Sequence, residues 1–391
     1  MSYVLLILAL IGHTALWVAC INRLHAVSIS RKIIDLLTVL CGVMLVFSPI
    51  AFLLAAWTNW DSREAFLHVP WIFIWGYAAV CSVAGGFAAI QWLQRAWSAR
   101  SRGVLFSNHT TRFRAQERAS QPLTAPGIPT WLSRVPGNQV LDICVHEKEL
   151  LVPRIPPEQG GLRVAHLTDL HMSGRITRGY FEQVVEEVNR AEPDVVAITG
   201  DIIERAACID WIPATLGRLR APGGVHYVLG NHDMRVDIER LKDVMEDAGL
   251  NYLGGRWQKV AVRGMPLILA GNELPWFGPA ADFGSCDSQG ENSRPLRLLL
   301  AHTPDQFDWA QRNDIDLILA GHNHGGQIRL PILGPIFSPS LHGVRYASGI
   351  FRVGHTIMHV SRGTCCLTPL RFNCPPEIAV LVLNQGMKAL D

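Results

Sequence analysis

The sequence predicts an α/β layered domain preceded by three transmembrane helices, on three observations. Three long segments near the N-terminus carry no Lys, Arg, Asp or Glu. From about residue 139, short apolar runs alternate with amphipathic helical patterns, which is typical of strands and helices packed in layers. Several of the apolar runs end in Asp, Asn or His, as expected where the strands of an α/β sheet bring ligands to one edge.

The composition of the 391-residue chain favours a membrane protein with a folded domain. Only 17% of the residues are charged and 49% are hydrophobic, whereas soluble domains carry about 25% charged residues. These values exclude a disordered chain and a protein that coats nucleic acid. The nine cysteines are scattered and form no C-x-x-C pair, so we expect reduced thiols rather than a disulfide framework.

The three uncharged segments are each long enough to cross a bilayer, which takes about 20 predominantly apolar residues. We predict spans near residues 3–21, 36–57 and 69–93, within an anchor of residues 1–94. A cleaved signal peptide is the alternative for the first span, but no Lys or Arg precedes its apolar run. A buried helical hairpin is the alternative for the other two.

The charges that flank the spans predict their orientation. The first loop carries three basic residues and one acidic residue, and residues 95–118 carry six arginines against a single Glu117. The positive-inside rule then places the first loop and the C-terminal region in the cytoplasm. The basic stretch either binds anionic lipid head groups or only sets the topology. It lacks interleaved aromatic residues, so we expect no nucleic-acid partner.

The region after the anchor divides into a linker and a folded domain. Pro, Gly and Ser punctuate residues 119–138, so we assign residues 95–138 to a basic juxtamembrane segment and linker, and residues 139–391 to the domain. The predicted strands are 162–168, 194–199, 225–229, 267–270, 296–300, 316–320, 356–360 and 378–383, and the predicted helices are 176–191 and 236–248.

Metal-capable side chains follow five of the predicted strands. They are Asp169, His171, Asp201, Asn231, His302, His322 and His324. Each motif alone is explained by a turn or a helix cap, but their joint occurrence after apolar strands predicts a metal site. Carboxylate, imidazole and amide oxygen without thiolate suit Mn, Fe, Zn or Co. Seven ligands suit two ions about 3.5–4 Å apart.

These motifs resemble the five sequence blocks of the calcineurin-like metallophosphoesterases. The blocks are Asp169-x-His171, Gly200-Asp201, Gly230-Asn231-His232-Asp233, His302 and Gly321-His322-Asn323-His324. The resemblance covers roughly residues 160–385. It implies a four-layer α/β/β/α sandwich with a dinuclear site at the rim of its two sheets.

The resemblance also implies a role for each residue. One ion would be bound by Asp169, His171 and His324, and the other by Asn231, His302 and His322, with Asp201 bridging both. His232 would contact the phosphate and protonate the leaving oxygen, and Asp233 would orient His232. Asn323 stands where the commonest family form has Thr, and its side chain is expected to point away from the metals.

Further segments are similar to membrane-associated bacterial phosphoesterases, one branch of which hydrolyses UDP-2,3-diacylglucosamine in lipid A synthesis. The segments are 162–171, 324–331, 371–372 and 376–378. This similarity implies hydrolysis of a phosphodiester or pyrophosphate bond by a metal-bound hydroxide, with two divalent ions, Mn first among them. It also implies a multi-pass protein of the bacterial inner membrane with its catalytic domain in the cytoplasm. The expected partners are the lipid bilayer and a lipid-linked or nucleotide-linked phosphoester, without a protein partner.

Two other functions remain open, namely a protein or nucleotide phosphatase and a non-catalytic membrane scaffold with a structural metal site. Some residues outside the motifs also allow two interpretations. Glu273 and Trp276 either line a substrate cleft or pack a loop. The apolar loop Leu330–Phe337 either enters the bilayer, or holds acyl chains, or is an ordinary covered loop.

Overall fold

A computed structural model of the chain describes residues 3–61, 71–97, 104–155, 160–283 and 295–386. The chain forms two compact units. The first contains Met1–Ala99 together with Pro339–Gly343, and the second contains Arg100–Ser338 and Val344–Asp391.

The first unit contains three long apolar helices, α1 (Tyr3–Leu24), α2 (Arg31–Asp61) and α3 (Trp71–Trp97). Each is long and apolar enough to cross a membrane. Helices α1 and α3 pack closely because Gly12 and Gly85 face each other, and a Cβ on either would collide with the other helix's backbone. The His13 ring and the Tyr77 hydroxyl share a hydrogen bond of 2.7 Å between the same two helices. Residues 62–70, which include the start of the predicted span 69–93, lie outside the described residues.

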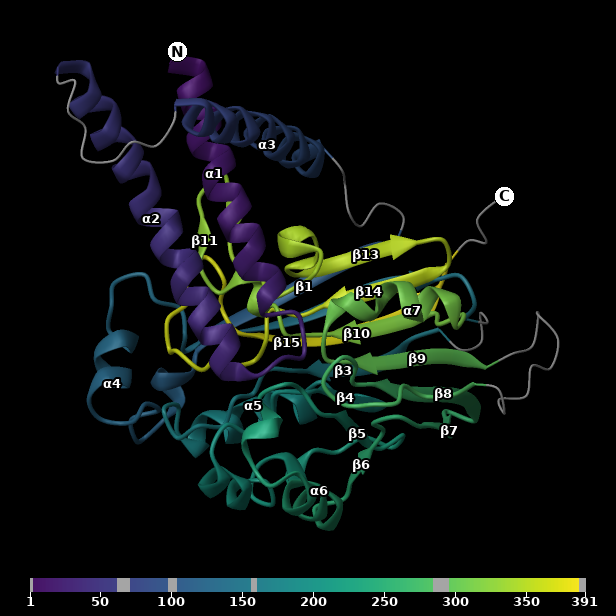
Figure 1. The fold of residues 1–391 in the computed structure, drawn as a ribbon. Helices are drawn as coiled ribbons and strands as arrows, with labels where there is room; N and C mark the ends of the chain where they lie inside the picture. The colour runs from purple at the N-terminus through teal and green to yellow at the C-terminus, as the bar shows by residue number, and fades with distance from the viewer. Residues whose placement is uncertain (1–2, 62–70, 98–103, 156–159, 284–294, 387–391) are drawn as a thin grey trace. The chain divides into compact units, whose positions relative to one another are not determined.

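The second unit is built on two mixed β-sheets (Figure 1). The first has the order β1-β2-β15-β3-β4-β5-β6 and the second β13-β14-β10-β9-β8-β7. A separate pair, β11 (Arg329–Leu330) and β12 (Gly334–Pro335), lies outside them. The strands of the first sheet are β1 Leu105–Arg114, β2 Asp142–Val152, β3 Leu162–Leu167, β4 Val195–Thr199, β5 Val225–Val228, β6 Leu250–Tyr252 and β15 Glu377–Gln385. Those of the second are β7 Trp257–Val262, β8 Met265–Asn272, β9 Leu296–Ala301, β10 Leu317–Ala320, β13 Gly349–Val353 and β14 Thr356–Val360.

Three apolar cores arrange these sheets and three helices into α/β/β/α layers. The helices are α5 Arg178–Arg190, α6 Ile238–Asp247 and α7 Phe307–Arg312. A further helix, α4 Ile128–Ser133, has no buried residue and belongs to none of these cores. The core between the two sheets joins residues such as Val164 of β3 to Leu298 of β9. A second core packs α5 and α6 on the outer face of the first sheet, and a third packs α7 on the outer face of the second. The layered α/β domain and the three preceding membrane helices are therefore as predicted.

Helix α5 shows how the apolar pattern builds a layer. The helix predicted over 176–191 forms over Arg178–Arg190 and buries Phe181, Val184, Val185 and Val188. Spacings of three and four residues place these side chains on one helical face. That face packs on the outer side of the first sheet, in the same core as Ala165 of β3.

The start of the second unit differs from the predicted boundary at residue 139. Strand β1 lies inside residues 95–138, the segment assigned to the basic juxtamembrane region and linker. It pairs antiparallel with β2. It escaped prediction because it is an edge strand with mostly exposed side chains, so it lacks an apolar alternation. Arg112 and Arg114 on β1 lie 2.6 and 3.9 Å from the Asp142 carboxylate of β2. Exposed arginines also prevent further strands from pairing with such an edge. Residues 98–103 of the basic juxtamembrane segment lie outside the described residues.

Candidate metal centre

The seven predicted metal ligands come together at the carboxyl ends of five strands. Strands β3, β4 and β5 are parallel in the first sheet, and β9 and β10 are parallel in the second. Their carboxyl ends therefore deliver the loops that follow them to one rim. The structure places Asp169 and His171 after β3, Asp201 after β4, Asn231 after β5, His302 after β9, and His322 and His324 after β10.

One group of potential ligand atoms is formed by Asp169, His171, Asp201 and His324. Their ligand atoms all lie within 4.8 Å of one another. The Nε2 atom of His171 lies 3.1 Å from Nε2 of His324 and 3.5 Å from an Asp201 oxygen. The Nε2 atom of His324 lies 3.4 Å from Asp169 Oδ1.

A second group is formed by Asp201, His302 and His322. The Nε2 atom of His302 lies 3.3 Å from Asp201 Oδ1 and 3.2 Å from Nδ1 of His322. The Asn231 side-chain oxygen lies 3.2 Å from the same His302 nitrogen. Asp201 thus belongs to both groups and presents one carboxylate oxygen to each. The grouping matches the two ligand sets that the sequence predicts.

The chemistry of this cluster fits divalent metal ions. Asp169, Asp201, His302 and His322 are buried, and buried carboxylates and ring nitrogens need a compensating partner. Two hydrogen bonds, one to a carboxylate and one to a backbone carbonyl, also fix which ring nitrogen of His171 and of His302 carries the hydrogen. The His171 Nδ1–H donates to Glu204 at 3.1 Å, and the His302 Nδ1–H donates to the Thr199 carbonyl at 2.7 Å. Both Nε2 lone pairs are then directed at the cluster, as in histidines that bind metals.

The backbone at the cluster is held in an uncommon conformation. Asp169, His171, Asp201, His322 and His324 have positive φ angles between 43° and 68°. Such positions cost on the order of 1–3 kcal/mol each and concentrate at functional sites. The conformation turns the chain sharply at each strand end, so the side chains point into the rim. Gly230 completes the packing, because a Cβ there would collide with the Asp201 carboxylate.

Burial and neighbouring charges separate the pKa values of the cluster. Burial lowers the pKa of His171 to about 4, and burial together with His171 and Arg371 lowers that of His324. Burial also disfavours the charged form of His302, but the Asp201 carboxylate outweighs it and raises the pKa to about 9. Burial raises the pKa of Asp201 less than His302 and His232 lower it, so Asp201 is held ionised. The neutral imidazoles of His171 and His324 beside the ionised Asp201 suit metal binding, and His302 would release its proton on binding a metal ion.

Glu204 is a functional residue that the sequence analysis did not identify. Its carboxylate accepts a hydrogen bond of 2.7 Å from Nδ1 of His232 and contacts Arg235. Because it also accepts from His171, this one buried side chain orients a potential ligand and the predicted acid together. Its signal in the sequence is an acidic residue three positions after Asp201.

Asp233 does not have the contact that was predicted for it. Its Oδ1 accepts the backbone N–H groups of Ile202 and Ile203, both at 2.9 Å, and its Oδ2 accepts that of Gly230 at 2.8 Å. The short turn Asp233–Arg235 directs this carboxylate toward the backbone of the loops that follow β4 and β5. His232 is bonded to Glu204 instead. Asp233 is therefore a brace between the loops after β4 and β5, and the contact with His232 that was predicted for it is made by Glu204.

Replacement of Asp233 is expected to act mainly on stability. In Asp233→Asn, an amide N–H group would face at least one of the three backbone donors. The loss should be about 1–3 kcal/mol, the usual penalty for an unsatisfied buried hydrogen-bonding group. Thermal unfolding of the metal-free protein measures it, with Asp243→Asn at an exposed position of α6 as the matched control. A melting temperature equal to that of the wild type would contradict the brace.

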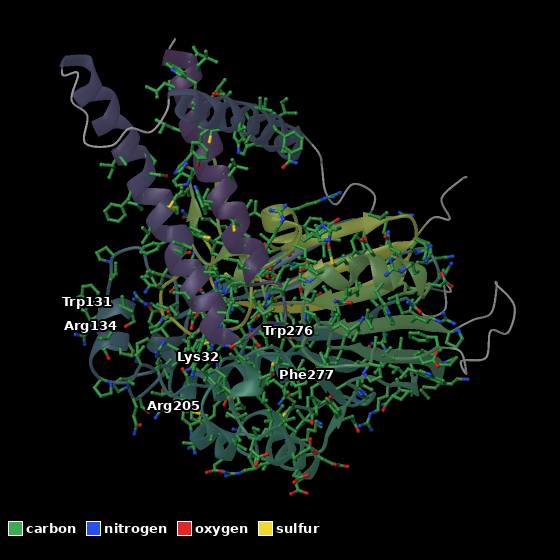
Figure 2. The ribbon with its side chains drawn as sticks, in the orientation of Figure 1. Lys32, Trp131, Arg134, Arg205, Trp276 and Phe277 are labelled. Atoms are coloured by element: carbon green, nitrogen blue, oxygen red, sulfur yellow. The ribbon has the colours of Figure 1, made fainter. Side chains whose placement is uncertain are left out.

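Aromatic and cationic side chains border the cluster on two sides. The Trp276 ring, labelled in Figure 2, lies 4.8 Å from the His322 ring and 5.5 Å from the His302 ring between centroids. The buried Arg371 approaches Nδ1 of His324 at 3.4 Å. The Asn323 amide donates to the Tyr346 carbonyl at 2.8 Å, so this side chain is engaged elsewhere.

The chain is similar in sequence to known proteins. The family model of the calcineurin-like phosphoesterases matches residues 162–326. The uncharacterized metallophosphoesterase YkuE of Bacillus subtilis is 31% identical over 237 residues, which are 59% of this chain and 82% of that protein. The phosphodiesterase YaeI of Escherichia coli is 28% identical over 56% of this chain and 82% of its own length. A bovine transmembrane protein with a metallophosphoesterase domain is 27% identical over 97% of this chain and 88% of its own length.

The fold and the cluster define a metal-binding α/β hydrolase. The chain belongs to the calcineurin-like metallophosphoesterase family. It is a membrane protein, as its three candidate membrane helices and its transmembrane relatives indicate. The family and the ligand groups around Asp201 indicate that it uses divalent metal ions.

Proposed function

We propose that this protein is a membrane-anchored phosphodiesterase or pyrophosphatase that uses two divalent metal ions, with Mn²⁺ as the preferred pair. The observation that carries this proposal is Asp201, which presents one oxygen to each of two ligand groups. A carboxylate shared between two sites is the arrangement that places ions about 3.5–4 Å apart for displacement at phosphorus. The similarity to a phosphodiesterase of Escherichia coli supports the diester substrate class.

The proposed ligands divide as the geometry groups them. Asp169, His171 and His324 hold one ion, Asn231, His302 and His322 hold the other, and Asp201 bridges. When bound, the ions supply an activated water and neutralise the charge on the phosphate oxygens.

His232 is the proposed acid that protonates the leaving oxygen. Its Nδ1–H is held by Glu204 at 2.7 Å, which leaves Nε2 for the substrate. The neighbouring carboxylate also fixes the orientation of the ring, as a positioned general acid requires. The backbone N–H of His232 donates to Asp201 Oδ1 at 2.8 Å, which fixes the distance between the acid and the bridging position.

The substrate is proposed to be a lipid-linked or nucleotide-linked phosphoester presented at the cytoplasmic face of a bacterial inner membrane. The predicted topology supports this location, and the similarity of segments such as 324–331 to lipid pyrophosphatases supports UDP-2,3-diacylglucosamine as the candidate. The test is incubation of the full-length protein in detergent with that substrate, followed by mass analysis. Release of UMP is expected. Phosphopeptide hydrolysis faster than diester hydrolysis would instead assign a protein phosphatase.

Metal removal is expected to abolish turnover and to destabilise the domain. Without cations, the buried Asp169 and Asp201 carboxylates repel each other, and burial together with Asp201 raises the pKa of Asp169. Dialysis against a chelator should reduce hydrolysis of bis(p-nitrophenyl) phosphate by at least about 10³-fold. It should also lower the melting temperature, because bound ligands stabilise the folded state. Both effects should be reversed by Mn²⁺, and turnover that survives complete chelation would contradict the proposal.

A further inference from the structure

The β11–β12 hairpin presents large apolar side chains to solvent directly after the last metal-binding motif. Its strands are Arg329–Leu330 and Gly334–Pro335, joined by a three-residue turn. Ile332 at the tip is 88% exposed and Leu333 is 54% exposed. Further exposed apolar residues on or beside the hairpin are Ile328, Leu330 and Phe337. A concentrated apolar surface of this kind marks an interaction site.

Ile332 has an unfavourable backbone conformation and an unfavourably exposed side chain, both of which a simple solvent-facing turn would avoid. It has a φ of +67°, which is an outlier for a β-branched residue, and its side chain is almost fully in water. A glycine or asparagine at this position would remove the strain and the exposure together. The tip is therefore built to hold an apolar side chain outward.

The base of the hairpin is fixed to the loop that holds His324. The Arg329 guanidinium donates to the Gly325 carbonyl at 2.7 Å, and its backbone N–H donates to the Phe372 carbonyl at 2.9 Å. A Cβ on Gly326 would collide with Pro335, so the second strand packs directly on this loop. The apolar tip thus has a defined position relative to the metal centre.

Helix α4 presents further exposed apolar side chains. Ile128 and Trp131 on this helix are 74% and 68% exposed, and Trp131 is labelled in Figure 2. The helix is tied to the segment that also supports the hairpin. The Asn138 amide bridges the carbonyls of Leu132 in α4 and Pro369, at 2.8 and 2.9 Å, three residues before Phe372. Exposed tryptophan is the side chain most typical of a membrane–water interface.

Basic residues occur on and near these elements in the sequence. No Asp or Glu occurs between residues 317 and 376; of the five arginines in that stretch, Arg371 is buried at the metal cluster and Arg352 lies on β13. Arg345 in the stretch and Arg134 at the end of α4 are exposed. Basic side chains beside an apolar surface complement an anionic lipid surface.

From these observations we infer that the β11–β12 hairpin and α4 form a docking surface for an anionic bilayer. The three membrane helices in the same chain keep a bilayer within reach. The chain also passes from the hairpin straight into the helical unit, which includes Pro339–Gly343. These links favour lipid over a protein partner. The substrate class in this inference rests on the proposed function. A metal centre docked on the bilayer would accept an amphiphilic phosphoester from the bilayer surface.

The first test reports docking without any substrate. Full-length protein with Ile332→p-benzoylphenylalanine is reconstituted in vesicles of phosphatidylethanolamine and phosphatidylglycerol, irradiated, and examined by mass for lipid adducts. The matched control is the same change at Val353, an exposed apolar residue at the β13–β14 turn, where β14 begins. Because β14 is parallel to β10, that turn lies at the amino end of these strands, whereas the metal centre lies at the carboxyl end of β10. We expect at least about tenfold more adduct at 332. Equal yields, or adducts to protein alone, would overturn the inference.

The second test separates docking from chemistry. Ile332→Asp/Leu333→Asp should lower hydrolysis of a phosphoester embedded in those vesicles by about tenfold, through burial lost from two apolar side chains. Turnover of soluble bis(p-nitrophenyl) phosphate should be unchanged in the variant, and Val353→Asp should affect neither substrate. Adducts at 332 without lipid hydrolysis by the wild type would retain docking and reject the lipid substrate. Lipid hydrolysis that is unaffected by the double substitution would reject the docking surface and retain the proposed function.

Discussion

Asp201→Asn is expected to reduce hydrolysis of bis(p-nitrophenyl) phosphate by at least about 10³-fold in kcat, the largest effect of any single substitution in this chain. Asp201 is the one residue common to both ligand groups. The amide keeps the shape of the side chain but removes the charge and one acceptor oxygen. Both groups are then affected, and His302 loses the carboxylate that raises its pKa to about 9.

A surface carboxylate provides the matched control for this substitution. Asp210 has 70% of its side chain exposed and pairs with Arg240 at 2.9 Å, so Asp210→Asn removes the same charge without touching the cluster. Its turnover should equal that of the wild type, since exposed pairs contribute little. Circular dichroism of Asp201→Asn should show the native fold. Wild-type turnover in the folded Asp201→Asn protein would rule out the shared-ligand assignment.

Glu204→Gln is expected to reduce kcat by about 10²-fold, with a larger loss for substrates whose leaving group is a poor one. The substitution removes the carboxylate that accepts from Nδ1 of His232 at 2.7 Å, so the proposed acid loses the group that positions it. A p-nitrophenolate leaves without a proton, whereas an alkoxide requires one. The ratio of activities on p-nitrophenyl and alkyl diesters therefore reports the role of the acid and not merely the integrity of the fold.

Two comparisons decide whether the effect belongs to Glu204. Glu239 has 80% of its side chain exposed on α6, so Glu239→Gln should have wild-type kinetics. Asp233→Asn should lower stability while the ratio between the two leaving groups stays near that of the wild type. If Asp233→Asn changes that ratio and Glu204→Gln does not, Asp233 is the partner of His232, as the sequence motif alone suggested.

The sequence was sufficient to predict the layers and the meeting point of the ligands. Apolar runs such as 195–199 are buried throughout, and a buried strand with a polar residue at its end leaves a clear pattern. Strand direction then predicts that these polar residues meet at one rim, whereas their division into two ligand groups was implied by the family resemblance.

Other features depend on geometry that no local pattern encodes. The Asp233 carboxylate turns toward Gly230 and Ile202 because a short helical turn begins there. Glu204 reaches His232 across two loops from different strands. Strand β1 is recognisable only by its pairing with β2, since its exposed residues lack alternation. Contacts between distant segments therefore account for most of what the sequence could not predict.

The number of Mn²⁺ ions bound per folded chain tests the central claim most directly. Metal-stripped full-length protein is dialysed against increasing Mn²⁺, and bound metal and hydrolysis of bis(p-nitrophenyl) phosphate are measured on the same samples. Two ligand groups that share Asp201 predict two ions per chain, with turnover appearing as the second ion binds. Full turnover with one ion or none would contradict the dinuclear centre.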